Sequence, residues 1–151
     1  MNITDELYQQ VILEHNRHAQ NYHPMENATH TAEGYNPLCV DHYHVHVKLD
    51  NQGLIEDVAF EGEGCAISKA SLSIMTDLLK GKTSDQVRVL FRAFHNLVTG
   101  QPLSSDSKQT LGKLAVFSGV CKFPTRVKCA TLGWHALLGA LDEVQGALSI
   151  E

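Results

Sequence analysis

The sequence predicts an α+β protein, with a small antiparallel sheet and helices packed on one side of it. Two observations carry this prediction. Residues 41–49 alternate between apolar and polar side chains, which is typical of a strand with one buried face. Segments with the apolar spacing of helices stand before this strand and after its hairpin partner, so the order is helix, strands, then helices.

The first half of the chain is expected to contain one helix and one hairpin. Thr4-Asp5-Glu6 caps the helix. A polar segment with scattered threonine, asparagine and proline follows and is interpreted as a loop. Two strands joined by a tight turn then form the hairpin. The expected bounds of the helix, the loop and the two strands are about 4–18, 21–34, 41–49 and 54–60.

Four helices are expected after the hairpin. Gly62-Glu63-Gly64 breaks the second strand, and Cys65 opens the first of these helices. Thr83-Ser84-Asp85-Gln86 resembles a capping box and begins the second. The stretch 121–124 is interpreted as a loop that leads into the last helix. The expected bounds of the four helices are about 65–79, 83–98, 104–117 and 125–147.

Composition places the chain among ordinary globular proteins. Its 151 residues, 43% hydrophobic and 19% charged, suit a single domain over 1–151. A net charge of −5 argues against nucleic acid as a partner. The acidic start is no signal peptide and no apolar run reaches membrane-spanning length, so the cytoplasm is the expected compartment and no membrane partner is expected. There, four cysteines are more often metal-binding, catalytic or free than disulfide-bonded.

The stretch Asn36-Pro37-Leu38-Cys39-Val40-Asp41 carries a thiol and a carboxylate two residues apart. Residues i and i+2 of an extended chain project from the same face, so Cys39 and Asp41 can reach one point. Asp41 also falls on the apolar side of its strand, where an unpaired carboxylate is costly to bury. A metal ion would offset that cost. The alternative is that the strand starts later and Asp41 caps the preceding turn.

Two further thiols occupy positions that packing explains poorly. Cys65 stands at a helix N-terminus, where N–H groups and the helix dipole favour the thiolate; the alternative is a small side chain at a crowded turn. Cys129 lies about 130° around its helix from the apolar stripe, with Arg126 one turn earlier. Three sulfurs and one oxygen, from Cys39, Asp41, Cys65 and Cys129, make a tetrahedral ligand set for zinc.

Other potential ligands are given no role. Cys121 lies in a predicted loop outside this set and is interpreted as a bystander. His42, His44 and His46 form a row like that of a transition-metal site. They alternate with Tyr43 and the other apolar residues of the strand and so lie on the opposite face of the sheet. The favoured interpretation is therefore that the three histidines face solvent.

Four stretches together resemble the U-type iron–sulfur assembly proteins, specifically the SufU branch of the family that includes the scaffold IscU. They are LYQQVILEH at 7–15, NPLCVD at 36–41, FEGEGCAIS at 60–68 and FPTRVKCATL at 123–132. The resemblance covers nearly the whole chain and implies a three-stranded antiparallel sheet with helices on one side. It also implies metal ligation by Cys39, Asp41, Cys65 and Cys129.

Members of the SufU branch bind zinc and act as sulfurtransferases. The resemblance therefore implies a zinc-dependent enzyme that accepts persulfide sulfur from a PLP-dependent cysteine desulfurase of the SufS type and serves downstream cluster assembly proteins. Cys39 is the implied acceptor, and Arg126 is a candidate for steadying the thiolate or persulfide. The alternative functions are a scaffold that builds a [2Fe–2S] cluster on the same thiolates and an adaptor with a purely structural zinc site.

Three local features bear on this choice, and a fourth, Val40, departs from the family pattern. Scaffold members carry histidine immediately before the last cysteine, whereas this chain has Lys128, and Gly133-Trp134-His135-Ala136-Leu137 replaces their chaperone signal. The segment 82–111 resembles the insertion typical of SufU proteins. Val40 replaces the glycine usual between the first cysteine and the aspartate, which is expected to reduce backbone freedom beside Cys39.

Overall fold

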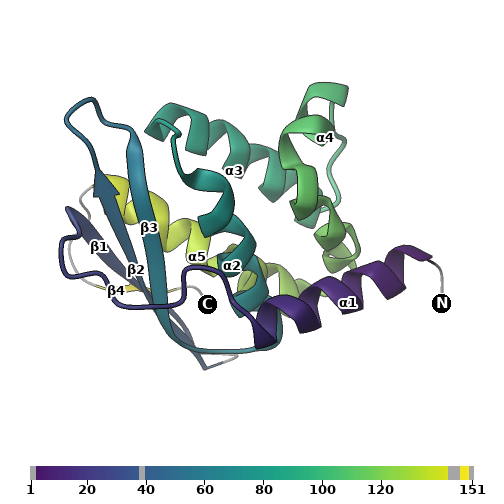
Figure 1. Ribbon diagram of the computed structural model, residues 1–151. Coiled ribbons are helices and arrows are strands. Elements are labelled where there is room, and N and C mark those ends of the chain that lie inside the picture. Colours follow the sequence, from purple (N-terminus) through teal and green to yellow (C-terminus); the bar gives the residue numbers. More distant parts are fainter. Residues whose placement is uncertain (1–2, 38–39, 143–146, 150–151) are drawn as a thin grey trace.

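The helices and strands follow the predicted order, with two strands that the sequence did not reveal (Figure 1). The computed structural model describes residues 3–37, 40–142 and 147–149, and side chains within 8–37 and 40–142. The elements are α1 (Ile3–Arg17), β1 (His30–Asn36), β2 (Asp41–Leu49), β3 (Ile55–Glu63), α2 (Ala66–Leu79), α3 (Ser84–Val98), α4 (Ser105–Leu111), the 3₁₀ helix η1 (Gly112–Lys122), α5 (Pro124–Leu141) and β4 (Ala147–Ser149).

The sheet has the strand order β3-β2-β1-β4. The three long strands are antiparallel, and β4 adds a short parallel strand beside β1. Along β2 the predicted alternation holds on the inner face, where Asp41, Tyr43, Val45 and Val47 are completely buried. The α+β class with three antiparallel strands is therefore confirmed.

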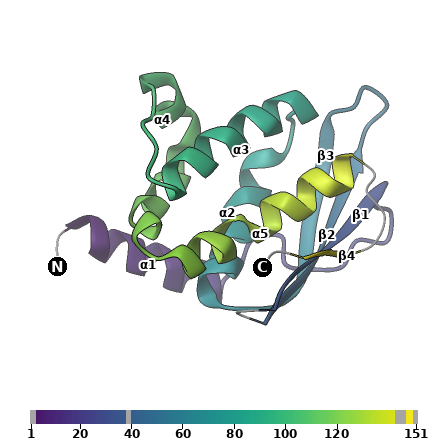
Figure 2. The same ribbon diagram turned by 180° about the vertical axis from the view of Figure 1, so that it is seen from behind.

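The helices lie on one side of the sheet, as predicted (Figures 1 and 2). Helix α5 packs against β1 and β2, and α2 packs against β3. The two helices approach closely at Gly133, where an added Cβ would stand 2.2 Å from Leu72 Cδ2. Behind them, the buried ring of Trp134 stacks on Phe94 with 5.2 Å between ring centroids. This apolar layer gives the end of the sheet a rigid support.

The predicted loop 21–34 was wrong, because β1 begins at His30. The inward residues of β1 include Ala32 and Gly34, so the strand has little of the β-branched and aromatic signal that marks strands. Helix α5 explains these small residues. A Cβ on Gly34 would lie 3.2 Å from Ala136 Cβ and 3.3 Å from Leu132 Cδ1. Close packing of α5 thus removed the sequence pattern that would have revealed the strand.

Two predicted helix bounds also differ. The helix expected over 104–117 ends at Leu111, because Gly112 has a φ of +51°, and the chain continues as η1 to Lys122. Cys121 therefore lies in a 3₁₀ helix and not in a loop. The last helix ends at Leu141 and not at about 147. Among the described helices, none has both the length and the apolar character needed to cross a bilayer.

Candidate metal centre

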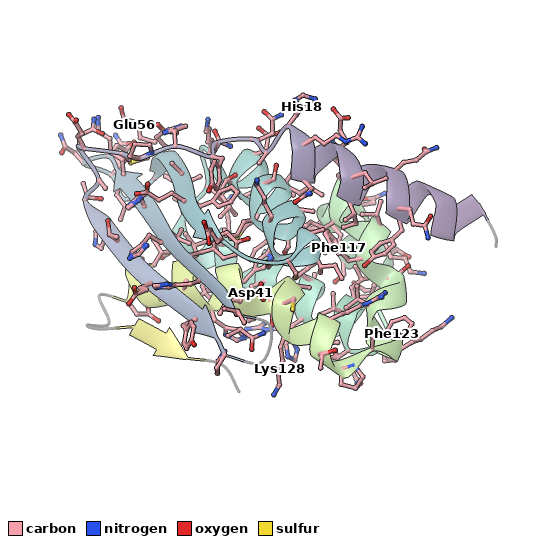
Figure 3. All side chains as sticks on the ribbon, turned by 90° about the horizontal axis from the view of Figure 1, so that it is seen from below. His18, Asp41, Glu56, Phe117, Phe123 and Lys128 are labelled. Atoms are coloured by element: carbon pink, nitrogen blue, oxygen red, sulfur yellow. The ribbon has the colours of Figure 1, made fainter. Side chains whose placement is uncertain are left out.

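Three of the four predicted ligands converge where β2 begins. Asp41, Cys65 and Cys129 each offer one donor atom, and the three atoms lie within 4.8 Å of one another. We call this group the sulfur site. The three residues come from β2, from the residue preceding α2, and from α5. Figure 3 shows Asp41 at the end of the sheet beside the first turns of α5, which carry Lys128. The fourth predicted ligand, Cys39, lies outside the described residues.

Asp41 is the buried acid of the site. Its Oδ1 accepts a hydrogen bond from the backbone N–H of Cys65 at 2.8 Å and from the Ser68 hydroxyl at 3.1 Å. Its Oδ2 is buried and has no hydrogen-bond partner among the described residues. Two bonds to one oxygen fix the carboxylate, and the second oxygen remains available to a ligand.

Cys65 is the N-cap of α2, as its place after a glycine turn predicted. The backbone N–H of Ser68 donates to Cys65 Sγ at 3.4 Å, so the sulfur takes the role that a cap oxygen usually has. A hydrogen bond from the Cys129 thiol is the main cause that lowers the pKa of Cys65 to about 6, with Ser68 contributing in the same direction. These hydrogen bonds favour the thiolate form of Cys65 over the thiol.

Cys129 is buried on the side of α5 that turns away from the predicted apolar stripe. This side of α5 packs against β1. Asn36, the last residue of β1, directs its side-chain amide toward Cys129 Sγ at 3.9 Å, a long and weak contact. Asn36 and Cys129 are both fully or almost fully buried.

Gly64 allows the strand end and the helix start to approach each other. A Cβ at this position would lie 2.5 Å from Asp41 Oδ1, and 2.7 Å from both the ring and the hydroxyl of Tyr43. No side chain fits at these distances. Gly64 therefore makes room for the carboxylate directly after the end of β3. The predicted break at Gly62-Glu63-Gly64 came too early, because Gly62 and Glu63 still pair with β2 and the strand ends at Glu63 rather than at about 60.

The donor set fits a zinc ion. Thiolate sulfur and carboxylate oxygen are common zinc ligands, and three protein donors leave one position for a fourth. Asp41 Oδ2 is buried and has no partner among the described residues, which is costly for a carboxylate unless a cation lies nearby. Asp41, Cys65 and Cys129 could hold the ion together.

A pocket of about 310 Å³ opens beside the sulfur site. It is lined by Tyr8, Gln9, Ile12, Leu13, Ile67 and Arg126. Burial raises the pKa of the Tyr8 phenol, the nearby Arg126 guanidinium opposes this, and the charges of Cys65 and Cys129 add to it. Arg126 is exposed and stacks on the Phe123 ring, 4.4 Å from its centroid. Arg126 and both thiols are thus close enough to Tyr8 to influence its phenol.

The structure adds two polar residues that sequence reasoning did not single out. Ser68 bonds to Asp41 and to the Cys65 backbone, and Asn36 faces Cys129. Both residues lie in the stretches quoted above, Ser68 at 60–68 and Asn36 at 36–41. The sequence alone did not show that their side chains point toward the sulfur site. Cys121 is exposed and is not part of the sulfur site.

Known proteins similar to this chain include iron–sulfur cluster assembly proteins. The NifU-like N-terminal domain family matches residues 7–130. The chain is 38% identical over 142 residues to the zinc-dependent sulfurtransferase SufU of Bacillus subtilis, covering 94% of each protein. It is 37% identical over 141 residues to the iron–sulfur cluster assembly scaffold protein IscU of Streptococcus pyogenes, covering 93% of this chain and 86% of the relative.

A solved structure matches the fold equally well. The crystal structure of FiSufU from Fervidobacterium islandicum AW-1, described as an iron–sulfur cluster assembly scaffold protein for the SUF system, superposes with a TM-score of 0.82 at 32% identity. The match covers 90% of this chain and 97% of that one. The residues that the family matches, 7–130, include Asp41, Cys65 and Cys129. The chain therefore belongs to the NifU-like N-terminal domain family, as one of its IscU/SufU-type members.

Proposed function

We propose that this protein is a zinc-dependent sulfurtransferase. It accepts persulfide sulfur from a PLP-dependent cysteine desulfurase of the SufS type and passes it to downstream iron–sulfur cluster assembly proteins. The observation that carries the proposal is the convergence of Asp41, Cys65 and Cys129 with their donor atoms within 4.8 Å. The similarity to the Bacillus subtilis sulfurtransferase over 94% of the chain supports the same function.

The proposed zinc ligands are Cys39, Asp41, Cys65 and Cys129. Bound zinc would keep these thiols deprotonated without redox chemistry of its own. The chain prepares the site for this role. Asp41 is fixed through Oδ1, and Cys65 has a pKa lowered to about 6 by its hydrogen bonds with Cys129 and Ser68.

Cys39 is the proposed sulfur acceptor. In the chain it stands two residues from Asp41, a member of the sulfur site, and three residues from Asn36, which contacts Cys129. Its thiolate would attack the terminal sulfur of the desulfurase persulfide. A new S–S bond forms on Cys39, the S–S bond of the desulfurase breaks, and the desulfurase cysteine leaves as a thiolate. The step is an exchange and needs no oxidant or reductant.

Arg126 is the proposed positioning cation. It lines the pocket beside the sulfur site, where a guanidinium would stabilise an anionic persulfide. Arg126→Ala should then slow sulfur uptake, and Arg126→Lys should restore part of the rate. Arg92, an exposed arginine of α3, provides the matched control as Arg92→Ala. If Arg126→Ala and Arg92→Ala slow sulfur uptake equally, the loss reflects the change in net charge and not a specific role of Arg126.

The second candidate function is a scaffold that holds a [2Fe–2S] cluster on the same donors. The Streptococcus pyogenes relative bears the name of such a scaffold. Lys128 argues against it, because an ammonium group cannot ligate iron as an imidazole can. Metal analysis of protein purified without added metal separates the two. About one zinc per chain and a colourless protein support the transferase, whereas a brown protein supports the scaffold.

A labelling experiment tests the acceptor directly. The protein is incubated with desulfurase and cysteine, thiols are alkylated, and peptides are examined by mass spectrometry. The extra sulfur should be found on Cys39. Cys39→Ser should abolish it while much of the zinc remains, whereas Cys65→Ser should lose both. Cys121→Ser is the matched control and should behave as wild type. Extra sulfur on Cys121 would overturn the assignment.

A further inference from the structure

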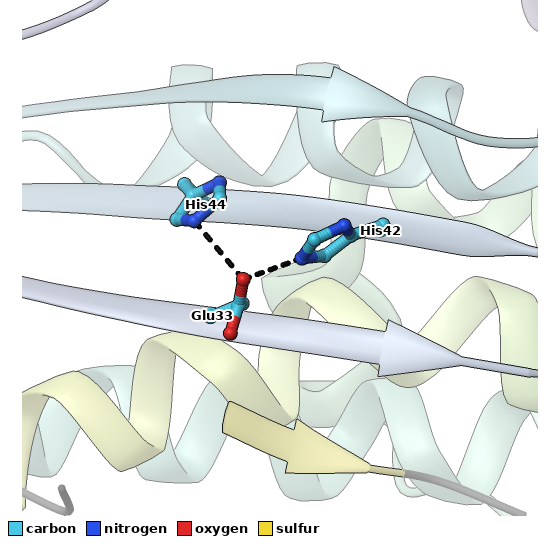
Figure 4. Close-up of side chains that lie close together, drawn as sticks. All are labelled: Glu33, His42 and His44. Atoms are coloured by element: carbon cyan, nitrogen blue, oxygen red, sulfur yellow. Dashed lines mark hydrogen bonds and ion pairs between the residues drawn. The ribbon is translucent and has the colours of Figure 1, made fainter. Parts of the chain in front are cut away.

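A second group of potential metal ligands lies on the outer face of the sheet. Glu33 on β1 and His44 on β2 are cross-strand partners, and His42 stands two residues before His44 on the same face. Glu33 Oε2 lies 2.5 Å from His42 Nε2 and 3.2 Å from His44 Nε2 (Figure 4). We call these three residues the histidine cluster. Their donor atoms all lie within 4.8 Å of one another.

The histidine cluster is separate from the sulfur site. Successive residues of a strand point to opposite faces, so the buried Asp41 and Tyr43 face the helices while His42 and His44 face away from them. The side chains of His42, His44 and Glu33 are 49%, 44% and 31% exposed. An ion can therefore reach the histidine cluster from solvent without passing the sulfur site.

We propose that Glu33, His42 and His44 form a second metal site, which takes a divalent transition-metal ion such as Zn²⁺, Ni²⁺ or Cu²⁺. Two imidazole nitrogens and one carboxylate oxygen suit these ions, and the absence of sulfur separates this site chemically from the first. The cross-strand pairing holds the three donors together before any ion arrives, so binding requires little rearrangement of the backbone.

Binding exchanges one set of contacts for another. Without metal, each imidazole Nε2 faces the carboxylate through a hydrogen bond, so Nε2 carries the proton. With metal, Nε2 must present its lone pair, so the proton moves to Nδ1 or is released to solvent. Three protein ligands leave the remaining coordination positions to water or to a group from another molecule. The site is therefore open and its ion exchangeable.

His46, on the same strand, is a histidine whose two ring nitrogens both have protein partners. Its Nδ1 lies 3.1 Å from the Thr31 hydroxyl, its Nε2 lies 2.9 Å from Glu61 Oε1, and its side chain is only 11% exposed. Both ring nitrogens are in use, and His46 lies outside the histidine cluster. It is therefore the matched control.

The test uses the full-length protein loaded with one equivalent of zinc. Titration with Ni²⁺ or further Zn²⁺, followed by calorimetry, should reveal one additional equivalent. Glu33→Gln, His42→Gln and His44→Gln should each weaken this second equivalent by more than about tenfold, since even loss of an outer-shell partner costs 10–100-fold. His46→Gln should change the second affinity by less than about twofold. Glu33 is half-buried and glutamine is nearly isosteric with glutamate, so the Glu33→Gln protein should fold.

Spectroscopy assigns each equivalent to its site. Cobalt bound by thiolates has an intense sulfur-to-metal charge-transfer band, which imidazole and carboxylate ligands do not give. The first equivalent of Co²⁺ added to metal-free protein should develop this band, and the second should add only weak d–d absorption. Absence of a second equivalent in wild type would overturn the proposal. So would a second equivalent that binds equally well to Glu33→Gln and to wild type.

Discussion

The backbone N–H of Cys65 donates a 2.8 Å hydrogen bond to Oδ1 of Asp41. This bond joins the first residue of β2 to the N-cap of α2, so a single carboxylate both orders the helix start and lies beside its sulfur. The other carboxylate oxygen is buried without a partner among the described residues. Oδ1 thus serves the fold, whereas Oδ2 remains available to a cation.

Asp41→Asn should have opposite effects with and without zinc. An amide keeps the acceptor for the Cys65 N–H, and a neutral group costs less to bury than a carboxylate with one unpaired oxygen. The metal-free variant should therefore be as stable as wild type or more so. With zinc it should be less stable, because a weaker ligand gives less stabilisation by mass action. Urea denaturation with and without one equivalent of zinc measures both.

The control is Asp77→Asn, which removes an exposed carboxylate from α2. Asp77→Asn should change the stability of the metal-free protein and that of the zinc-loaded protein by similar small amounts. If Asp41→Asn also changes the zinc-loaded and metal-free proteins equally, the carboxylate does not act on the metal.

Gly64→Ala should destabilise the protein and weaken zinc binding together. The new methyl group would overlap Asp41 Oδ1 and the Tyr43 ring, at 2.5 and 2.7 Å. Overpacking of this kind costs about 1–3 kcal/mol. Gly119→Ala is the control, because a Cβ there meets nothing within 4 Å. Thermal unfolding and a zinc competition assay check the pair, and equal behaviour of the two variants would contradict the role of Gly64.

Sequence periodicity was sufficient for part of the site. The parity of β2 placed Asp41 on the buried face, and the glycine turn before α2 placed Cys65 at a helix start; both predictions are confirmed. The pattern of apolar residues could not reveal β1, because its inner residues are small where α5 packs on them. Because β1 was not predicted, neither its contact with Cys129 nor its pairing beside the histidines of β2 could be predicted. Glu33 was therefore missed as a potential ligand.

The sequence also could not show in which direction side chains point in the folded protein. Ser68 and Asn36 are polar residues whose roles depend on which way their side chains point once α2 and β1 are docked. The histidine row illustrates the same limit. His42 and His44 are solvated as predicted, but His46 is buried by its contacts with Thr31 and Glu61. The alternation along a strand assigns each residue to one face of the sheet. It does not show whether neighbouring side chains bury a particular residue on that face.

Val40→Gly should not destabilise the protein, although glycine usually does at an ordered position. Val40 has a φ of +57°, and its side chain is 72% exposed, so it makes little use of its methyl groups. A left-handed conformation costs an L-residue about 1–2 kcal/mol, which exceeds the roughly 0.5–1 kcal/mol of chain entropy that glycine adds. The free energy of unfolding from urea titrations should stay equal or rise.

Val89→Gly supplies the contrast. Val89 is also exposed, but it lies within α3, where glycine should cost about 0.5–1 kcal/mol. Val40→Asn should resemble Val40→Gly, because asparagine tolerates the left-handed region. A loss at position 40 as large as that at position 89 would show that Val40 is not strained.

The last prediction concerns His15, a buried histidine far in the chain from the sulfur site. Its Nδ1 lies 2.7 Å from the Ser73 hydroxyl, which also accepts the backbone N–H of Gln20. Burial is the main cause that lowers the pKa of His15, and the charge of Lys113 acts in the same direction. The native state therefore favours the neutral imidazole.

Stability should fall as pH falls below about 6.5, the ordinary histidine pKa. In this range the unfolded chain binds a proton that native His15 does not, and stability decreases with falling pH wherever the unfolded state binds more protons. The loss continues down to the native pKa and then levels off. Its slope cannot exceed about 1.4 kcal/mol per pH unit for one proton. His135, whose pKa burial also lowers, adds to the loss with the same sign.

Urea denaturation of wild type and His15→Gln between pH 8 and 5 checks this. Cys65 and His135 are present in both proteins, so the difference between the two stability profiles isolates His15. Wild type should lose more stability than the variant on acidification, and the imidazole resonance of His15 should titrate below the ordinary histidine pKa. Parallel profiles, together with an ordinary titration of that resonance, would show that burial does not hold this histidine neutral.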